Sequence, residues 1–120
     1  FIDSSFDRAR EFQRLTQGLA AAHKKFATGV YALWYPLMEP AAMRGFERGI
    51  VATGIRKILQ LEICVMPEHW TTSMRGCGML VVNPPFGFEA VARRIVAWLQ
   101  PVLAREARVP APPVQWLARE

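Results

Sequence analysis

The stretch Val30-Tyr31-Ala32-Leu33-Trp34-Tyr35 decides the fold class of this chain. Its six residues are aliphatic or aromatic without polar alternation, and the run is too short for a typical helix. A continuous apolar run of this length, bounded here by Gly29 and Pro36, is typical of a strand that is buried on both faces. Such strands belong to parallel sheets with helices on each side. The stretch therefore predicts an α/β fold.

Three amphipathic segments surround this run. Residues 7–26 predict a helix, because apolar residues recur at spacings of three and four. A second helix is predicted from Pro40, which is tolerated in a first turn, to Thr53-Gly54. A third is predicted over residues 87–104, with Pro101 ending or kinking it. The apolar residues expected on the inner faces are Phe12, Leu15, Leu19, Ala22 and Phe26, then Met43, Phe46 and Ile50, then Phe88, Val91, Ile95, Trp98 and Val102.

Three further segments predict strands. Lys57–Met66 is a second apolar run, Met79–Val82 is a third, and Val114–Leu117 is a short terminal one. The polar segment Glu68–Gly78 has no helical pattern, so the second and third strands are expected to form an antiparallel hairpin with a long loop. The alternation of strands and helices elsewhere favours a sheet with right-handed crossovers.

Length and composition indicate one small globular domain. The chain has 120 residues, of which 52% are hydrophobic and 21% charged, and this balance argues against disorder. The apolar runs are shorter than the roughly 20 residues of a membrane span. Cys64 and Cys77 are too few for a disulfide scaffold or a zinc site, so we expect free thiols in the cytoplasm. Phe1-Ile2-Asp3 resembles the end of a buried strand, which suggests that upstream sequence is missing.

The charge of the chain suits a nucleic-acid partner. The net charge is +5 and the isoelectric point is about 9.9. Many basic proteins bind no nucleic acid, so the basic residues on the predicted helices have two interpretations, phosphate contacts or solvated helix faces. His23 and His69 have no carboxylate or cysteine at ligand spacing, and no metal site is expected. The basic residues in question are Lys24, Lys25, Arg44, Arg48, Arg93 and Arg94.

Two turns resemble the Asp/Asn-Pro-Pro-aromatic motif of methyltransferases that act on exocyclic amino groups. In that motif, the side-chain oxygen and a main-chain carbonyl accept hydrogen bonds from the amine, and the aromatic ring stacks on the flipped base. Two prolines stiffen the turn because they fix φ. Asn83-Pro84-Pro85-Phe86 matches by letters, whereas Asp3-Ser4-Ser5-Phe6 keeps only the acid and the ring.

Each turn also has a simpler structural interpretation. Asn83-Pro84-Pro85 can merely end a strand, and Pro85 can help to start the next helix. Ser4 followed by Asp7 resembles a capping box with Asp in place of Glu. The four letters of each turn do not decide between these alternatives.

Several long stretches of the chain resemble the bacterial 23S ribosomal RNA adenine-N6 methyltransferase family, and this resemblance covers essentially all 120 residues. In that family the catalytic turn stands just before the helix that leads into a Phe-Ala-Thr-Gly stretch, which is the position of Asp3–Phe6. The Asn-Pro-Pro stretch recurs there as a structural feature. The stretches that carry the resemblance are Phe26–Pro36, Ala52–Gln60, Gly78–Pro85 and the ending with Trp116.

The resemblance implies a fold and a reaction. Residues 1–120 would be the C-terminal half of a class I, Rossmann-like methyltransferase sheet, mostly parallel with an antiparallel last strand. The donor would be S-adenosylmethionine, bound largely by an absent N-terminal half. Asp3 and the Ser4 carbonyl would orient the amine, Phe6 would stack on the base, and Asp3 would also lie beside the donor. Ser4 and Ser5 depart from the family pattern and loosen the turn.

The resemblance also implies a partner and leaves a rival. The substrate would be ribosomal RNA, and no membrane is expected. Because the strand ending at Asp3 would have lost its inner neighbours, we expect self-association through an exposed sheet edge. The rival is a non-enzymatic basic module, derived from the same fold, that binds RNA or a protein. The serines at 4 and 5 and the missing donor site favour that rival.

Overall fold

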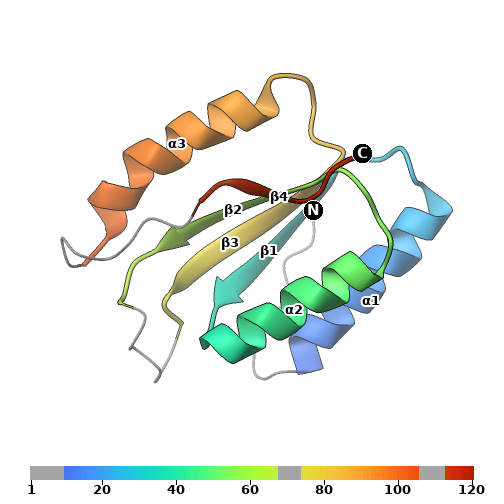
Figure 1. The fold of residues 1–120 in the computed structure, drawn as a ribbon, viewed down its shortest axis with the longest axis horizontal. Coiled ribbons are helices and arrows are strands. Elements are labelled where there is room, and N and C mark those ends of the chain that lie inside the picture. The colour runs from blue at the N-terminus through green and yellow to red at the C-terminus, as the bar shows by residue number, and fades with distance from the viewer. Residues whose placement is uncertain (1–9, 68–73, 106–112) are drawn as a thin grey trace.

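The computed structural model describes residues 10–67, 74–105 and 113–120 of the chain (Figure 1). The described residues alternate helices and strands, as the sequence predicts. In chain order the elements are α1 (Arg10–Lys25), β1 (Tyr31–Leu37), α2 (Pro40–Ala52), β2 (Ile58–Cys64), β3 (Gly76–Val82), α3 (Phe88–Leu103) and β4 (Gln115–Ala118).

The described strands form one sheet in the order β1-β3-β2-β4, and every neighbouring pair is antiparallel. The expectation of a mostly parallel sheet with an antiparallel last strand is therefore wrong for this part of the chain. The cause is the predicted hairpin, which is confirmed. β1 and β2 point the same way and are joined through α2, but β3 turns back from β2 and inserts between them. No two strands of equal direction are then neighbours.

Two strands are longer than predicted. β1 continues through Pro36, which pairs with Cys77 of β3, to Leu37. A proline has no N–H to donate, and it is tolerated here because β1 lies at an edge of the described sheet. β3 begins at Gly76 rather than Met79. Its two glycines read as loop residues in the sequence, yet both lie in the strand where other groups approach closely.

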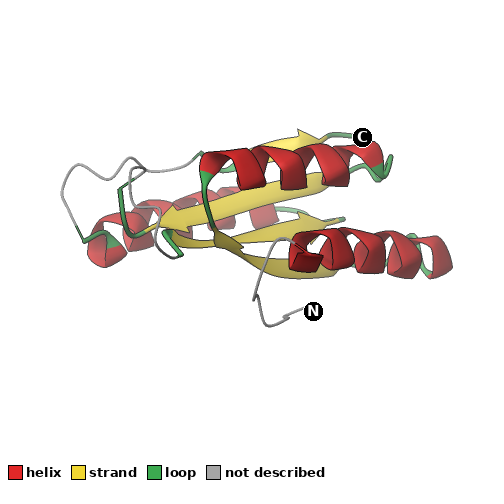
Figure 2. Cartoon of the chain, turned by 90° about the horizontal axis from the view of Figure 1, so that it is seen from below, coloured by secondary structure: helices red, strands yellow, loops and turns green. Residues whose placement is uncertain are grey.

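Helices cover both faces of the sheet (Figure 2). α1 and α2 pack on one face, where the predicted inner residues Met43, Phe46 and Ile50 are all buried. α3 packs on the other face against Leu59 of β2. The face that α1 and α2 cover is the larger core, and it also buries Phe12, Leu15, Leu19, Leu33, Tyr35, Leu37, Ile58, Leu80 and Val82.

The predicted inner face of α3 is wrong at four of its five residues, of which only Phe88 packs inward. Ile95 and Trp98 are 51% and 68% exposed, and Val91 and Val102 are exposed as well. The residues that pack inward are Ala92 and Val96, with Gln100. Apolar residues occupy two adjacent arcs of this helix, and the sheet covers the arc with the smaller side chains. Periodicity weighted by large residues selects the other arc.

Candidate functional site

The two ends of the sheet differ in what they can bind. β1 and β2 end together at Leu37 and Cys64, because both pair antiparallel with β3 in matching register. β3 ends at Val82, so Asn83 lies at the opposite end of the sheet, beside the starts of β1 and β2. β1 and β2 share a direction and are joined through α2, although β3 lies between them in this sheet. In α/β sheets whose parallel strands are joined through helices, ligands bind outside the carboxyl ends of those strands. That end is therefore the candidate site.

The literal motif at Asn83 is a structural turn. The Asn83 side-chain amide donates to the carbonyl oxygens of Ala27 and Gly29, both at 2.9 Å. Asn83 has a positive φ of 55°, which asparagine tolerates better than most residues. Phe86 is fully exposed. The amide thus ties the end of β3 to the connection between α1 and β1, and this occupies both of its donors.

Asp3, Ser4, Ser5 and Phe6 lie outside the described residues, but the direction of α1 is informative. Near the end of α1, the Ala22 carbonyl accepts a hydrogen bond from the hydroxyl of Tyr31, the first residue of β1. Near its start, Phe12 packs on Phe46, which in turn packs on Tyr35 towards the end of β1. α1 therefore runs antiparallel to β1 and begins on the side of the candidate site.

A buried polar cluster lies on the α2 face of the sheet, towards the same end. The Tyr35 hydroxyl donates to Glu62 at 2.6 Å. The Gln60 amide nitrogen lies 3.0 Å from the Tyr35 hydroxyl oxygen and 3.1 Å from Oε1 of both Glu47 and Glu62. The Gln115 amide donates to the Gln60 side-chain oxygen at 2.8 Å. These contacts link β1, β2, β4 and α2 through one network.

Burial changes the acidity of this cluster. Removal from water raises the pKa of Glu62, and the nearby Glu47 carboxylate raises it further, against the opposing effects of the Tyr35 hydrogen bond and Arg75. Burial also raises the pKa of Tyr35 well above its ordinary value, and the Glu62 carboxylate adds to this shift. Tyr35 is therefore a permanent hydrogen-bond donor at neutral pH, which suits a structural network.

The sequence reasoning missed this cluster. Tyr35 lies inside the apolar run that predicts β1, and its partner Glu62 is 27 residues away. The available signal was the pair Gln60 and Glu62, which interrupts the apolar strand at a spacing of two and so places both side chains on one face. A strand expected to be buried on both faces needs a partner for such polar groups.

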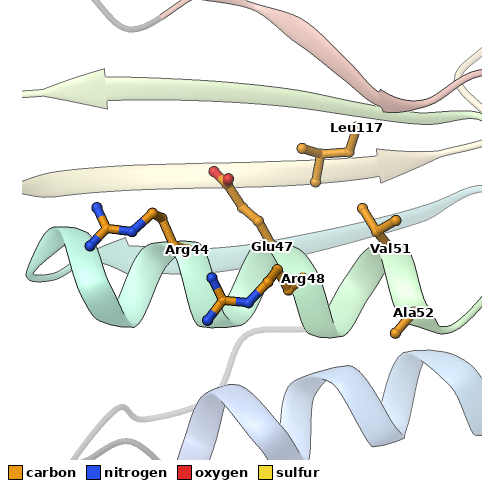
Figure 3. Close-up of a pocket in the computed structure, with 6 residues that line it drawn as sticks. All are labelled: Arg44, Glu47, Arg48, Val51, Ala52 and Leu117. Atoms are coloured by element: carbon orange, nitrogen blue, oxygen red, sulfur yellow. The ribbon is translucent and has the colours of Figure 1, made fainter.

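A shallow groove of about 600 Å³ lies between α2 and β4 (Figure 3). Arg44, Glu47 and Arg48 of α2 line it, with Leu117 of β4 among the remaining residues. Glu47 points towards the sheet, where its carboxylate meets Gln60. Both arginine side chains extend instead towards the amino-terminal end of α2, the direction that helical side chains favour.

Among the described residues, no glycine-containing turn joins a strand to a helix at the candidate end. The connection from β1 to α2 at the candidate end is Met38-Glu39, with no glycine to let a ligand approach the backbone. Gly87, with φ of 81°, precedes α3 but lies at the opposite end of the sheet.

Within the described ranges, no three His, Cys, Asp or Glu side chains cluster as metal ligands. No helix among these residues is long and apolar enough to cross a membrane.

Comparison with known proteins gives a family for this fold. A family model described as "Ribosomal RNA large subunit methyltransferase D, RlmJ" matches residues 1–118. The chain belongs to this family. It is 39% identical over 98 residues to the ribosomal RNA large subunit methyltransferase J of Escherichia coli (strain K12), covering 82% of this chain and 35% of that protein. The Haemophilus influenzae (strain ATCC 51907 / DSM 11121 / KW20 / Rd) protein of the same name is 33% identical over 119 residues, covering 99% and 42%.

A solved structure supports the fold of the chain. A crystal structure of a protein from Legionella pneumophila (strain Philadelphia 1) superposes with a TM-score of 0.77 at 29% identity, covering 86% of this chain and 38% of that one. The chain thus spans well under half the length of the RlmJ relatives and of this structure. The resemblance to the 23S ribosomal RNA methyltransferase family, drawn from the sequence, is confirmed.

Proposed function

We propose that this chain supplies the target-base side of an enzyme that methylates an adenine N6 amino group in 23S ribosomal RNA, as part of a longer protein. The family match, which includes residues 3–6, carries the proposal. S-adenosylmethionine supplies the methyl group in this reaction. Most of its site would lie outside this chain, which covers 35% and 42% of the two relatives.

In this proposal three residues of the turn before α1 hold the base. The Asp3 carboxylate and the Ser4 main-chain carbonyl accept hydrogen bonds from the two N–H groups of the amine, which fixes the direction of its lone pair. The Phe6 ring stacks on the flipped adenine. Asp3 would also lie beside the donor. Orientation is the main contribution, since a misplaced amine loses about a hundredfold in rate for a displacement near 1 Å.

Two structural observations support this position for the turn. α1, the helix that follows it in the sequence, begins on the side where β1 and β2 end. The competing turn lies at the other end of the sheet, and both amide donors of Asn83 are used on Ala27 and Gly29.

The test is methyl transfer by a longer protein in which the family's N-terminal half precedes this chain. Labelled methyl is counted on an adenine-containing RNA, below the melting temperature of each variant. Asp3→Ala is expected to abolish transfer. Asn83→Ala is expected to lower the melting temperature but to leave most of the transfer. Loss of transfer in Asn83→Ala alone, with an active Asp3→Ala protein, would reverse the assignment.

A non-enzymatic RNA- or protein-binding module is the second candidate. The serines at 4 and 5 favour it, because they remove the two prolines that stiffen the family's turn. The same longer protein distinguishes the two. If the enzyme hypothesis holds, Ser4→Pro with Ser5→Pro raises a measurable starting rate. If the module hypothesis holds, neither the starting protein nor this double variant transfers methyl.

A further inference from the structure

We infer that Arg44 and Arg48 of α2 bind phosphate groups of the RNA strand that presents the target base. This inference rests on the proposed function and extends it to a surface that recognises the RNA backbone. The chemistry recognised is a single-stranded phosphodiester chain.

The two guanidinium groups are available for an external anion. Arg44 and Arg48 are exposed and stand four residues apart, which places them on one side of α2. None of the ion pairs among the described residues includes either of them. The intervening carboxylate of Glu47 is turned to the sheet and accepts a hydrogen bond from Gln60. Neither of these two adjacent positive charges is therefore neutralised by an ion pair among the described residues.

The guanidinium groups also point the right way. Both side chains extend towards the amino-terminal end of α2. That end follows directly from the carboxyl end of β1, where the candidate site lies. The first turn of α2 has no side-chain cap, so its free N–H groups contribute positive potential there, beside the negative charge of the N-cap residue Glu39. An RNA strand that delivers a base to this end would pass its flanking phosphates near Arg44.

The groove beside the arginines fits the rest of a nucleotide. Val51 and Ala52 of α2 and Leu117 of β4 give it an apolar wall. Such a wall suits sugar carbons and base faces, whereas the guanidinium groups suit phosphate oxygens, which they bind in a bidentate manner. The combination of charge and apolar surface matches a nucleic-acid strand better than a small free anion.

Four other basic residues on the helices are less well placed. Lys24 and Lys25 end α1, whose carboxyl end lies beside the start of β1 and so away from the candidate site. Arg93 is already paired with Glu89 at 2.8 Å. Arg94 shares α3 with Arg93, on the opposite face of the sheet from α2. Of these six residues, Arg44 and Arg48 are the pair that has no ion pair among the described residues and extends towards the candidate end.

The experiment measures binding of the 120-residue chain to a fluorescently labelled, adenine-containing RNA 12-mer over a range of KCl concentrations. Each phosphate contact to a single strand contributes about 0.7 to the slope of log affinity against log salt. The double variant R44Q/R48Q is expected to lose about 1.4 from this slope and at least about tenfold in affinity at low salt. R93Q/R94Q removes the same charge from the other face and is expected to keep the wild-type slope. Circular dichroism checks that both variants are folded.

Three results would overturn the inference: equal losses in the two double variants, an unchanged slope in R44Q/R48Q, or no RNA binding by the wild-type chain at low salt. None of them removes the proposed function, which is judged by the effect of Asp3→Ala on methyl transfer. In the longer protein, R44Q/R48Q is expected to raise the KM for RNA more than it lowers kcat. The reverse pattern would assign the arginines to the chemical step instead.

Discussion

Gly78 of β3 allows the Tyr35 side chain to lie over β3 and reach the neighbouring strand β2. Tyr35 on β1 and Glu62 on β2 both pair with Gly78 on β3, so the three residues form one row. A Cβ atom at position 78 would overlap the Tyr35 ring. The missing side chain is thus what lets the hydroxyl reach Glu62. This explains why a glycine lies inside a central strand, where it is normally unfavourable.

Gly78→Ala is accordingly expected to lower the free energy of unfolding by about 1–3 kcal/mol, the usual range for overpacking a core. Gly45→Ala is the matched control. Position 45 is in α2 and has open space for a methyl group, so alanine should raise helix stability by about 0.5–1 kcal/mol. Urea unfolding followed by circular dichroism measures both. Equal changes in the free energy of unfolding for the two substitutions would contradict the close approach of the Tyr35 ring to Gly78.

The raised pKa of Glu62 predicts a pH-dependent stability. A raised folded-state pKa means that the folded protein binds the proton more tightly than the unfolded one. The stabilising contribution is present below the unfolded pKa and is lost as pH rises through the folded one. Glu62→Gln cannot ionise, so its melting temperature should match the wild type near pH 4 and exceed it at pH 8. Glu39→Gln, at an exposed position, controls for the loss of one charge. A Glu62→Gln advantage that shrinks with rising pH would contradict the assigned direction.

The periodicity of α3 predicts one inner face, whereas tertiary packing buries an adjacent one. Its existence and its ends agree closely with the predicted 87–104. Its orientation could not be predicted, because two adjacent arcs are apolar. Gln100 also fixes the orientation: its amide donates to the Cys64 carbonyl at 2.6 Å and accepts from the Cys64 N–H at 2.9 Å. The described pairing of β4 with β2 runs from Ile58 to Gln60, and the Gln100 side chain bonds the main chain of Cys64 farther along β2.

The orientation of α3 gives a prediction that reverses the sequence-based one. Val96 is 6% exposed and Ile95 is 51% exposed. Val96→Ala should cost about 1–3 kcal/mol of unfolding free energy, because it leaves a cavity against Leu59. Ile95→Ala should change it by no more than about 0.5 kcal/mol. Denaturant midpoints for the two variants test this, and a larger loss for Ile95→Ala would restore the predicted inner face.

The other elements show which features could be predicted from the sequence. The inner face of α2 was predictable because Met43, Phe46 and Ile50 form its one large apolar stripe. The hairpin was predictable because Glu68–Gly78 has no helical pattern. The sheet order was not predictable, because nothing local shows that β3 inserts between β1 and β2. The Tyr35 network was missed for the same reason, since it depends on strand register. Asp3–Phe6 were placed by family resemblance, and their geometry remains a prediction.

One edge of the described sheet is a strand without charged side chains. β1 is the outer strand of the described sheet and pairs there only with β3. Its seven residues, Tyr31–Leu37, include no charged side chain. Uncharged edge strands can template pairing with another chain, and Pro36 blocks only one position. In the RlmJ relatives, which are more than twice as long, we expect another strand of the same polypeptide to cover this edge.

The 120-residue chain is therefore expected to self-associate through β1 in a concentration-dependent manner, as light scattering would show. Ala32→Lys places a charge in the middle of this strand and should shift the chain towards monomer, because pairing would bury the ammonium group. Val51→Lys, at an exposed position on α2, makes the same kind of change away from the edge and should leave the association intact. Joining the family's N-terminal half should act as Ala32→Lys does, since it would occupy the edge from within. A wild-type chain that stays monomeric at all concentrations would refute this prediction, as would equal effects of the two lysine variants.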